Sequence, residues 1–459
     1  MKNRVAVLLL SGLLSAGLEC RSQTGNQEPA SASARSPGAV LRLSLKEAVD
    51  IALGAEGNPR VRMAEEIVSQ SKSRSAQARS ALLPNLEAGV GQLNRTQNLQ
   101  AFGLQFRLPI PGYQFPTLVG PYDVFDARAA ATQSAFDLSS IRRYQASRTG
   151  INQAQSESEN VQDLITGGVA RAYLAAVRAD AAVETARANL KLAQDLLDLA
   201  SSMKAAGSAT GIEVTRARVQ LAHEQQRVLV AENERRQACL QLLKSIGMDL
   251  TTPVELTQAL AFLPVEVTAA DQALQTAFET RNDWKAQAQR EQSAQLSYSA
   301  VKWERLPSVG LFGDYGTVGT SINDAIPTRT YGFTVKVPVF DGGRRDARRA
   351  ESASQLRQER LRTHELHDQI ELEVRTALDN LKSSIDLVRT AEEGLSLSES
   401  ELAQAERRYR AGVGTGLEVT DAQTRLQRAR DDRILALFYY NLSRIDLGTA
   451  MGTIRQMIQ

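Results

Sequence analysis

The chain has 459 residues, enough to bury a substantial core, and its 54 basic residues nearly balance its 52 acidic ones, which leaves a net charge of +2. This balance gives no reason to expect nucleic acid as a partner, because nucleic-acid binding calls for a clustered basic surface. Three histidines and two cysteines are too few for an ordinary histidine or thiolate metal site. No nucleophile–base arrangement or cofactor motif stands out, so the sequence predicts neither an enzyme nor a bound cofactor.

The N-terminus has the pattern of a secretory signal peptide, which we place at residues 1–19. Two basic residues precede a short apolar run that ends at Leu18 and is too short for an ordinary membrane span. Cys20 lies where a lipidated cysteine would follow the signal, but Glu19 occupies a position at which a small residue is usual, so lipidation stays open. Residues 20–40 are rich in Ser, Ala, Gly, Gln and Pro, which predicts a flexible leader.

Residues 41–250 are predicted to form a first structural repeat. Helical periodicity ends at Leu83-Pro84, because the residue before a proline is pushed out of the α region. Two extended segments follow with a polar loop between them, and then a stretch almost free of glycine and proline predicts a helix far longer than average. The predicted elements are strands at about 86–93 and 126–136, a long helix to Lys204, a tip at about 206–212 and a returning helix to Ile246.

The same order of elements recurs after a connector at residues 251–268. The second predicted repeat covers residues 269–459, and its Leu306-Pro307 corresponds to the Leu-Pro pair of the first repeat. Its predicted elements are strands at about 309–315 and 330–340, a long helix to Arg410, a tip at about 410–416 and a final helix to Met451.

A glycine-rich segment that occurs twice is the clearest sign of duplication. Ala206–Thr215 and Ala411–Thr420 match at a separation of 205 positions, and in each of them a helical pattern stops on glycine and restarts at once. Each segment is therefore predicted to be the tip of a helical hairpin. Apolar residues spaced seven apart predict that the hairpin helices pack as long antiparallel coiled coils, as at Leu381, Val388, Leu395, Leu402 and Tyr409. The predicted fold class is mainly α with a small β part.

The extended segments indicate the compartment. In Tyr331–Val339 the odd-numbered residues are apolar and the even-numbered ones are Gly, Thr, Lys and Pro, which in a strand gives one apolar and one polar face. Two strands per repeat are barely stable alone, and four strands from one chain cannot close a barrel with a usable lumen, so their edges must pair with other copies. Combined with a signal peptide and helices too polar to span a bilayer, this pattern suggests an oligomeric barrel in an outer membrane.

Four features together carry a family resemblance: the duplicated plan, the Leu-Pro before each predicted hairpin, and the segments Val337–Arg344 and Tyr409–Thr415. With them the chain resembles the TolC-like outer-membrane efflux channel family over nearly its whole mature length. The resemblance implies a homotrimer with a twelve-stranded β-barrel in outer-membrane lipid, four strands from each subunit, on an α-helical barrel in the periplasm. It also implies a passive exit duct of a tripartite efflux pump or type I secretion system, with a periplasmic adaptor and an inner-membrane pump as partners.

Within that family the second tip belongs to the inner coiled coil that narrows the periplasmic entrance, so the resemblance implies a gate there. Tyr409, Glu418 and Asp421 match the family's tyrosine and its two acidic residues, with glutamate at 418 where aspartate is common. Glu418 and Asp421 share a helix face, and in a trimer they would form carboxylate rings that attract cations. Two simpler interpretations stay open: Asp421 forms a surface ion pair with Arg425, and Glu418 favours the helix start through the macrodipole.

The glycines and threonines of the tips have a structural and a functional interpretation. Gly207 and Gly412 are expected to supply a positive φ, and Thr210 and Thr415 to cap the helices that follow. The resemblance implies in addition that these four residues contact the hairpin tips of the periplasmic adaptor. The first tip has one acidic and one basic residue where the second has its acidic pair, a difference that fits one outer and one inner hairpin.

A rival hypothesis from another class is a non-pore periplasmic coiled-coil spacer or adaptor protein. Such a protein would have no need of two alternating hairpins with long loops. The sequence does not specify the cargo, because a wide water-filled tunnel has no pocket whose shape the residues would define.

Overall fold

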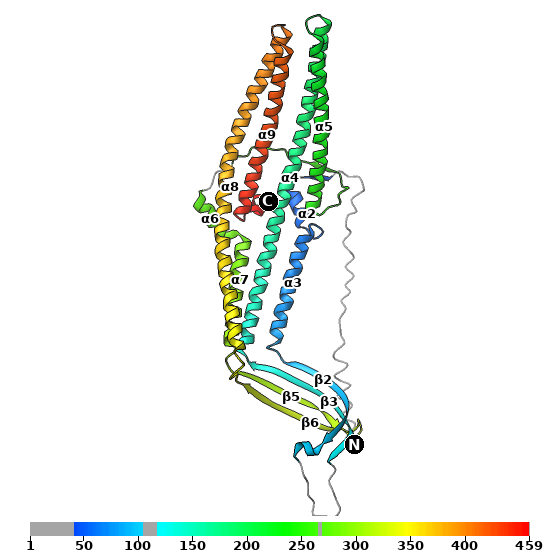
Figure 1. The fold of residues 1–459 in the computed structure, drawn as a ribbon, viewed down its shortest axis with the longest axis vertical. Coiled ribbons are helices and arrows are strands. Elements are labelled where there is room, and N and C mark those ends of the chain that lie inside the picture. Colours follow the sequence, from blue (N-terminus) through cyan, green and yellow to red (C-terminus); the bar gives the residue numbers. More distant parts are fainter. Residues whose placement is uncertain (1–40, 104–116, 265–268, 459) are drawn as a thin grey trace, which may run out of the picture.

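The computed structural model describes residues 41–103, 117–264 and 269–458 as an elongated molecule, with a β-sheet at one end and two helical hairpins at the other (Figure 1). The predicted signal peptide and leader, residues 1–40, lie outside the described residues. The elements in chain order are β1 (Leu41–Leu43), α2 (Leu45–Leu53), α3 (Pro59–Ser80), β2 (Asn85–Asn98), the 3₁₀ turn η1 (Leu99–Phe102), β3 (Leu118–Phe136), α4 (Leu138–Ala205), α5 (Gly211–Ile246), β4 (Val254–Leu256), α6 (Ala270–Thr280), α7 (Asn282–Trp303), β5 (Ser308–Gly319), β6 (Ile326–Lys336), α8 (Arg344–Arg410), α9 (Gly416–Ala450) and α10 (Ile454–Ile458).

The mainly helical, duplicated fold predicted from the sequence is confirmed. The order α2, α3, β2, β3, α4, α5 is repeated by α6, α7, β5, β6, α8, α9. The two long helices, α4 and α8, have 68 and 67 residues, and each pairs with a helix of about half its length, α5 and α9. Among the described residues, no helix is both long and apolar enough to cross a bilayer.

The four long strands form one antiparallel sheet in the order β2-β3-β5-β6. Three of them extend past the predicted bounds, because the ladder continues through polar residues: Asn94 pairs with Asp123, and the Asn94 amide donates to the Asp123 carboxylate at 2.8 Å. The prediction of a strand at 330–340 was wrong at both ends, since β6 covers Ile326–Lys336. Pro338 has no N–H for the ladder, and the chain leaves the sheet before it.

A two-stranded parallel sheet near the middle of the molecule was not predicted. β1 pairs with β4, so the predicted connector at residues 251–268 contains a strand that contacts the first repeat. The Tyr173 hydroxyl of α4 donates to the Leu43 carbonyl at 3.0 Å, and both residues are buried. Three-residue strands are too short to give a periodic pattern, which is why the sequence did not indicate them.

The core consists of separate apolar clusters spaced along the molecule. One lies where α2, α4 and α5 meet, and its counterpart lies where α6, α8 and α9 meet. A third cluster joins the two hairpins near their tips, where Leu192, Leu196 and Met203 of α4 pack against residues of α8 and α9. The two hairpins are therefore held side by side at the end remote from the sheet (Figure 1).

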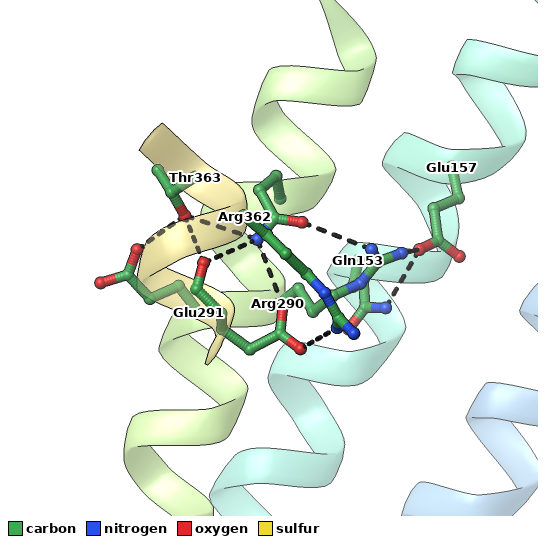
Figure 2. Close-up of polar contacts among 8 residues, drawn as sticks. Gln153, Glu157, Arg290, Glu291, Arg362 and Thr363 are labelled. Carbon is green, nitrogen blue, oxygen red and sulfur yellow. Dashed lines mark hydrogen bonds and ion pairs between the residues drawn. The ribbon is translucent and has the colours of Figure 1, made fainter. Parts of the chain in front are cut away.

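Nearer the sheet, polar contacts hold α7 between α4 and α8 (Figure 2). Arg290 of α7 forms an ion pair with Glu157 of α4. On the other side of α7, Gln287 donates to Glu359 of α8 at 3.2 Å, and the Thr363 hydroxyl of α8 donates to Glu291 of α7 at 2.8 Å. The three helices thus form a continuous wall that connects the hairpins to the sheet.

Candidate functional site at the helical tips

The two tips have the same backbone. Gly207 and Gly412 have φ values of +79° and +73°, a conformation that favours glycine, as the sequence predicted. Behind each glycine, two successive N–H groups donate to a single carbonyl of the preceding helix, that of Met203 in the first tip and that of Arg408 in the second. Equivalent sequences therefore give equivalent turns, and any difference in function must come from the side chains.

The capping residues show such a difference. Thr210 and Glu213 form a capping box at the start of α5, in which the Glu213 carboxylate accepts from the Thr210 N–H at 3.1 Å. At the start of α9 the Thr415 hydroxyl accepts from the Glu418 N–H at 3.3 Å. The Glu418 carboxylate, however, turns to Arg408 of α8, with Nε and Oε2 3.4 Å apart. The Glu418 side chain of the second tip therefore takes no part in a capping box, whereas the Glu213 side chain of the first tip does.

Asp421 lies one turn further along α9 and is exposed. The ion pair between Asp421 and Arg425, which was the simpler interpretation left open by the sequence, is not formed, because Arg425 pairs with Glu401 of α8 instead. Within the described ranges Asp421 has no ion pair. The charge of the Asp421 carboxylate is therefore not balanced by a neighbouring cation in the described chain, whereas Arg408 partly neutralises the charge of Glu418.

Tyr409 is directed into the contact between the two hairpins. Its side chain is 5% exposed and belongs to the cluster that joins α4 to α8 and α9. A cavity of about 30 Å³ lies beside it, lined by Glu213 and Arg216 of the first hairpin and by Gly416 and Gln423 of the second. Burial raises the pKa of the Tyr409 phenol, and the negative charge of Glu213 raises it further, so the hydroxyl stays protonated at neutral pH.

The lining of this cavity holds two buried polar groups that lack a hydrogen-bond partner, the Tyr409 hydroxyl and the Gln423 amide nitrogen. A site of this size with several polar groups has room for a water molecule that would satisfy them. The contact between the tips therefore combines apolar packing around Tyr409 with two polar groups that have no hydrogen-bond partner in the described chain.

A second polar contact joins the hairpins further from the tips. Glu224 of α5 is 1% exposed and accepts from Gln220 at 2.9 Å. Gln427 of α9, with its amide nitrogen towards Glu224, donates to it at 3.0 Å. Arg227 of α5 forms an ion pair with Asp431 of α9 at 2.7 Å. This cluster could not be predicted from the sequence, because its members are ordinary polar residues of two helices and meet only when the hairpins pack together.

The buried Glu224 carboxylate predicts a pH dependence of stability. Burial raises the pKa of Glu224, Arg227 opposes the rise, and Asp431 adds to it. The folded protein therefore holds this proton more tightly than the unfolded chain, so stability falls as the pH rises from the ordinary pKa to the raised one and stays lowered above it. We expect Glu224→Gln to raise the thermal unfolding midpoint at pH 7.5.

At a pH below the ordinary value of 4.5, Glu224 is protonated in both states, and the same substitution should change the midpoint little. Calorimetry at both pH values checks this, with the exposed Glu234→Gln on the same helix as the control. A midpoint at pH 7.5 that falls with Glu224→Gln would show that the carboxylate stabilises the contact as an anion.

The sequence did not predict that Glu213 of the first tip lies next to Tyr409 and Gly416 of the second hairpin. A Cβ built on Gly416 would lie 3.5 Å from the Glu213 Cγ, so the first turns of α5 and α9 touch. The matching Thr-x-x-Glu pattern of both tips was the available signal, but it indicates caps and not which side chains meet. Within the described ranges, no group of three or more His, Cys, Asp or Glu side chains is placed to hold a metal ion.

These features define a class of protein: a subunit with a four-stranded sheet, a long helical wall and two hairpins that contact each other at their tips. The model of the family described as outer membrane efflux protein matches residues 52–248 and 273–453, which is most of the chain. The chain belongs to this family. It is an outer-membrane efflux channel protein whose helices extend into the periplasm.

Known relatives agree with this assignment. The chain is 24% identical over 380 residues to the pyoverdine export outer membrane protein OpmQ of Pseudomonas aeruginosa, a match that covers 79% of this chain and 76% of the relative. It is 25% identical over 344 residues to the outer membrane protein TolC of Vibrio cholerae, which covers 73% and 78%. The fold matches the CmeC outer membrane channel of Campylobacter jejuni with a TM-score of 0.78 at 15% identity, over 89% of this chain and 86% of that one. These relatives are described as outer-membrane, export and channel proteins.

Proposed function

We propose that three copies of the chain form a gated exit duct of a tripartite efflux pump or a type I secretion system. The sheet supports this assembly, because β2 and β6 each leave one edge without a partner strand in the described chain. If β6 of each copy pairs with β2 of the next, three copies make a closed ring of twelve strands, and closure removes every free edge. Three is the copy number that the resemblance to TolC-like channels implies.

The gate we propose is the α8–α9 hairpin, with Tyr409, Glu418 and Asp421 as its functional residues. One observation carries this proposal: two tips with the same backbone use their acidic residues differently. Glu213 is bound in a cap, whereas Asp421 is exposed and unpaired. Only the second tip can therefore present a row of free carboxylates to a central entrance, one from each subunit.

Opening is a separation of the second hairpin from the first. The contacts that would break are the packing of Tyr409 against α4 and the polar contacts Arg227–Asp431 and Glu224–Gln427. A partner that binds the separated hairpins more tightly than the closed pair shifts the population towards the open duct.

The partner that fits this role is a periplasmic adaptor, and the inner-membrane pump supplies the energy. Gly207, Thr210, Gly412 and Thr415 are exposed and lie in the turns that join α4 to α5 and α8 to α9. These turns are at the end of the molecule remote from the sheet (Figure 1). Exposed apolar side chains at the same ends, Ile212 and Val413 among them, offer contact area to hairpin tips of the adaptor.

The assembly is tested by fractionation followed by native mass spectrometry. We expect the protein in the outer-membrane fraction, where detergent extracts a particle with three times the mass of the mature chain. Recovery of a water-soluble monomer from the periplasm would support the non-pore spacer and contradict the duct.

A further inference from the structure

The chain passes between the sheet and the helices at four places, and each place has an exposed apolar side chain. Leu83 lies between α3 and β2, and Phe136 ends β3 just before α4. Leu306 lies between α7 and β5, and Phe340, which is 86% exposed, lies between β6 and α8. All four junctions are at the level where the helical wall meets the sheet (Figure 1).

Basic residues surround these apolar side chains. We call the residues next to the sheet, 74–84, 137–148, 300–307 and 341–351, the basic belt. It contains eleven lysines and arginines against five aspartates and glutamates. Its excess of six positive charges is larger than the net charge of the whole chain, +2, so the positive charge is concentrated at one level of the molecule.

Helix stability does not explain this concentration. Arg142 and Arg143 lie in the first turns of α4, and Arg344 and Arg345 begin α8. The N-terminus of a helix is its positive end, where cations are unfavourable by about 0.3–1 kcal/mol each. In α2, α5 and α9 the first turn has a glutamate and no such cluster of arginines, whereas α4 has no acidic residue in its first turn and α8 has Asp346 together with its two arginines.

Several charges of the belt are free to bind a ligand. Arg143 and Arg305 form ion pairs with acidic residues of the belt. Arg79 and Arg344, in contrast, are exposed and have no ion pair in the described part of the chain. Lys302 lies with its ammonium 5.5 Å from the ring centroid of Trp303, without a carboxylate partner among the described residues.

We propose that the basic belt binds the headgroups of anionic phospholipids in the periplasm-facing leaflet of the outer membrane. Apolar side chains next to free arginines match the boundary between acyl chains and headgroups, and tryptophan such as Trp303 favours the same depth. Free guanidinium groups bind phosphate through paired hydrogen bonds. The inference rests on the outer-membrane location of the protein and assigns a lipid class to one level of it.

Trp303 reports on this site. The chain has two tryptophans, so Trp284→Phe leaves Trp303 as the sole indole fluorophore. The oligomer as purified is placed in bilayers that contain either brominated phosphatidylglycerol or brominated phosphatidylethanolamine. We expect stronger quenching by the anionic lipid at equal mole fraction. Replacing Arg79→Gln and Arg344→Gln together should lower the preference by roughly fivefold for each arginine.

The control is Arg375→Gln with Arg389→Gln, which removes two exposed arginines from the middle of α8 and should leave the preference unchanged. Equal quenching by the two lipids would overturn the proposed preference for anionic lipid without contradicting the membrane location. Quenching by neither lipid would contradict the lipid preference and the membrane location of this level of the protein. Inorganic phosphate should reduce the preference no more than chloride does at the same ionic strength. If phosphate alone abolished it, the belt would be a site for free anions, and the lipid proposal would be wrong.

Discussion

Asp421→Asn together with Glu418→Gln should abolish most of the cation preference of the channel in single-channel recordings. Three unit charges about 8 Å from a passing ion each contribute about 0.5 kcal/mol in water, with opposite sign for cations and anions. The three contributions add to about 1.5 kcal/mol for each ion, so removing them should lower the cation-to-anion permeability ratio by on the order of a hundredfold at low ionic strength. At high salt the effect should shrink, because counterions screen the ring.

The single substitutions separate the two carboxylates. Glu418 is paired with Arg408, whereas Asp421 is unpaired, so Asp421→Asn should account for most of the loss. Glu392→Gln with Glu399→Gln removes two exposed carboxylates from α8 away from the tip and should leave selectivity unchanged. If the tip variants changed the permeability ratio no more than this control does, Glu418 and Asp421 would be ordinary solvated surface residues without a role in selectivity.

Tyr409→Ala should increase the closed-state conductance strongly, and Tyr409→Phe should not. The ring fills the contact of α8 with α4, and truncating a buried aromatic side chain removes about 3–5 kcal/mol of packing. If this packing exists only in the closed state, losing about 3 kcal/mol per subunit shifts the closed–open equilibrium by about two orders of magnitude per subunit.

Phenylalanine keeps the ring and loses only a hydroxyl that has no hydrogen-bond partner within the described residues. Comparing the two variants therefore separates packing from hydrogen bonding. A leak with Tyr409→Phe as large as with Tyr409→Ala would mean that the hydroxyl is bound in the closed assembly, to Glu213 through water or to a neighbouring subunit.

Much of the fold could be predicted from the sequence because its signals are local. Glycine ends α4 and α8 at the tips, Leu-Pro precedes β2 and β5, and a near-absence of glycine and proline marks the long helices. The ends of the strands were predicted less well. The ladder between β2 and β3 continues through polar residues, which look like a loop to any method that depends on apolar alternation.

The side-chain contacts of the proposed gate residues could be predicted only in part, because they depend on how the helices pack. Tyr409, Glu418 and Asp421 were inferred from the family resemblance and from their positions relative to the second tip, whereas the contacts of Tyr409 with α4 and of Glu418 with Arg408 depend on how the helices pack. An ion pair between Arg425 and Asp421, four residues apart, was one open interpretation, but Arg425 pairs with Glu401 instead. Local spacing limits which pairs can form within a helix, whereas the approach of another helix decides which pairs do form.

A reversible cross-link between the hairpins tests the proposed gate most directly. A Cβ on residue 416 would lie 3.5 Å from the Glu213 Cγ, the atom that a cysteine sulfur would replace at position 213. The double variant Glu213→Cys and Gly416→Cys therefore brings two cysteines close enough for a disulfide. With Cys239→Ser removing the free thiol of α5, the oxidised channel should stay at its closed-state conductance when the adaptor is added, and reduction should restore opening. Full opening with the bridge intact would show that the duct opens without separating α9 from α5, which would contradict the gate.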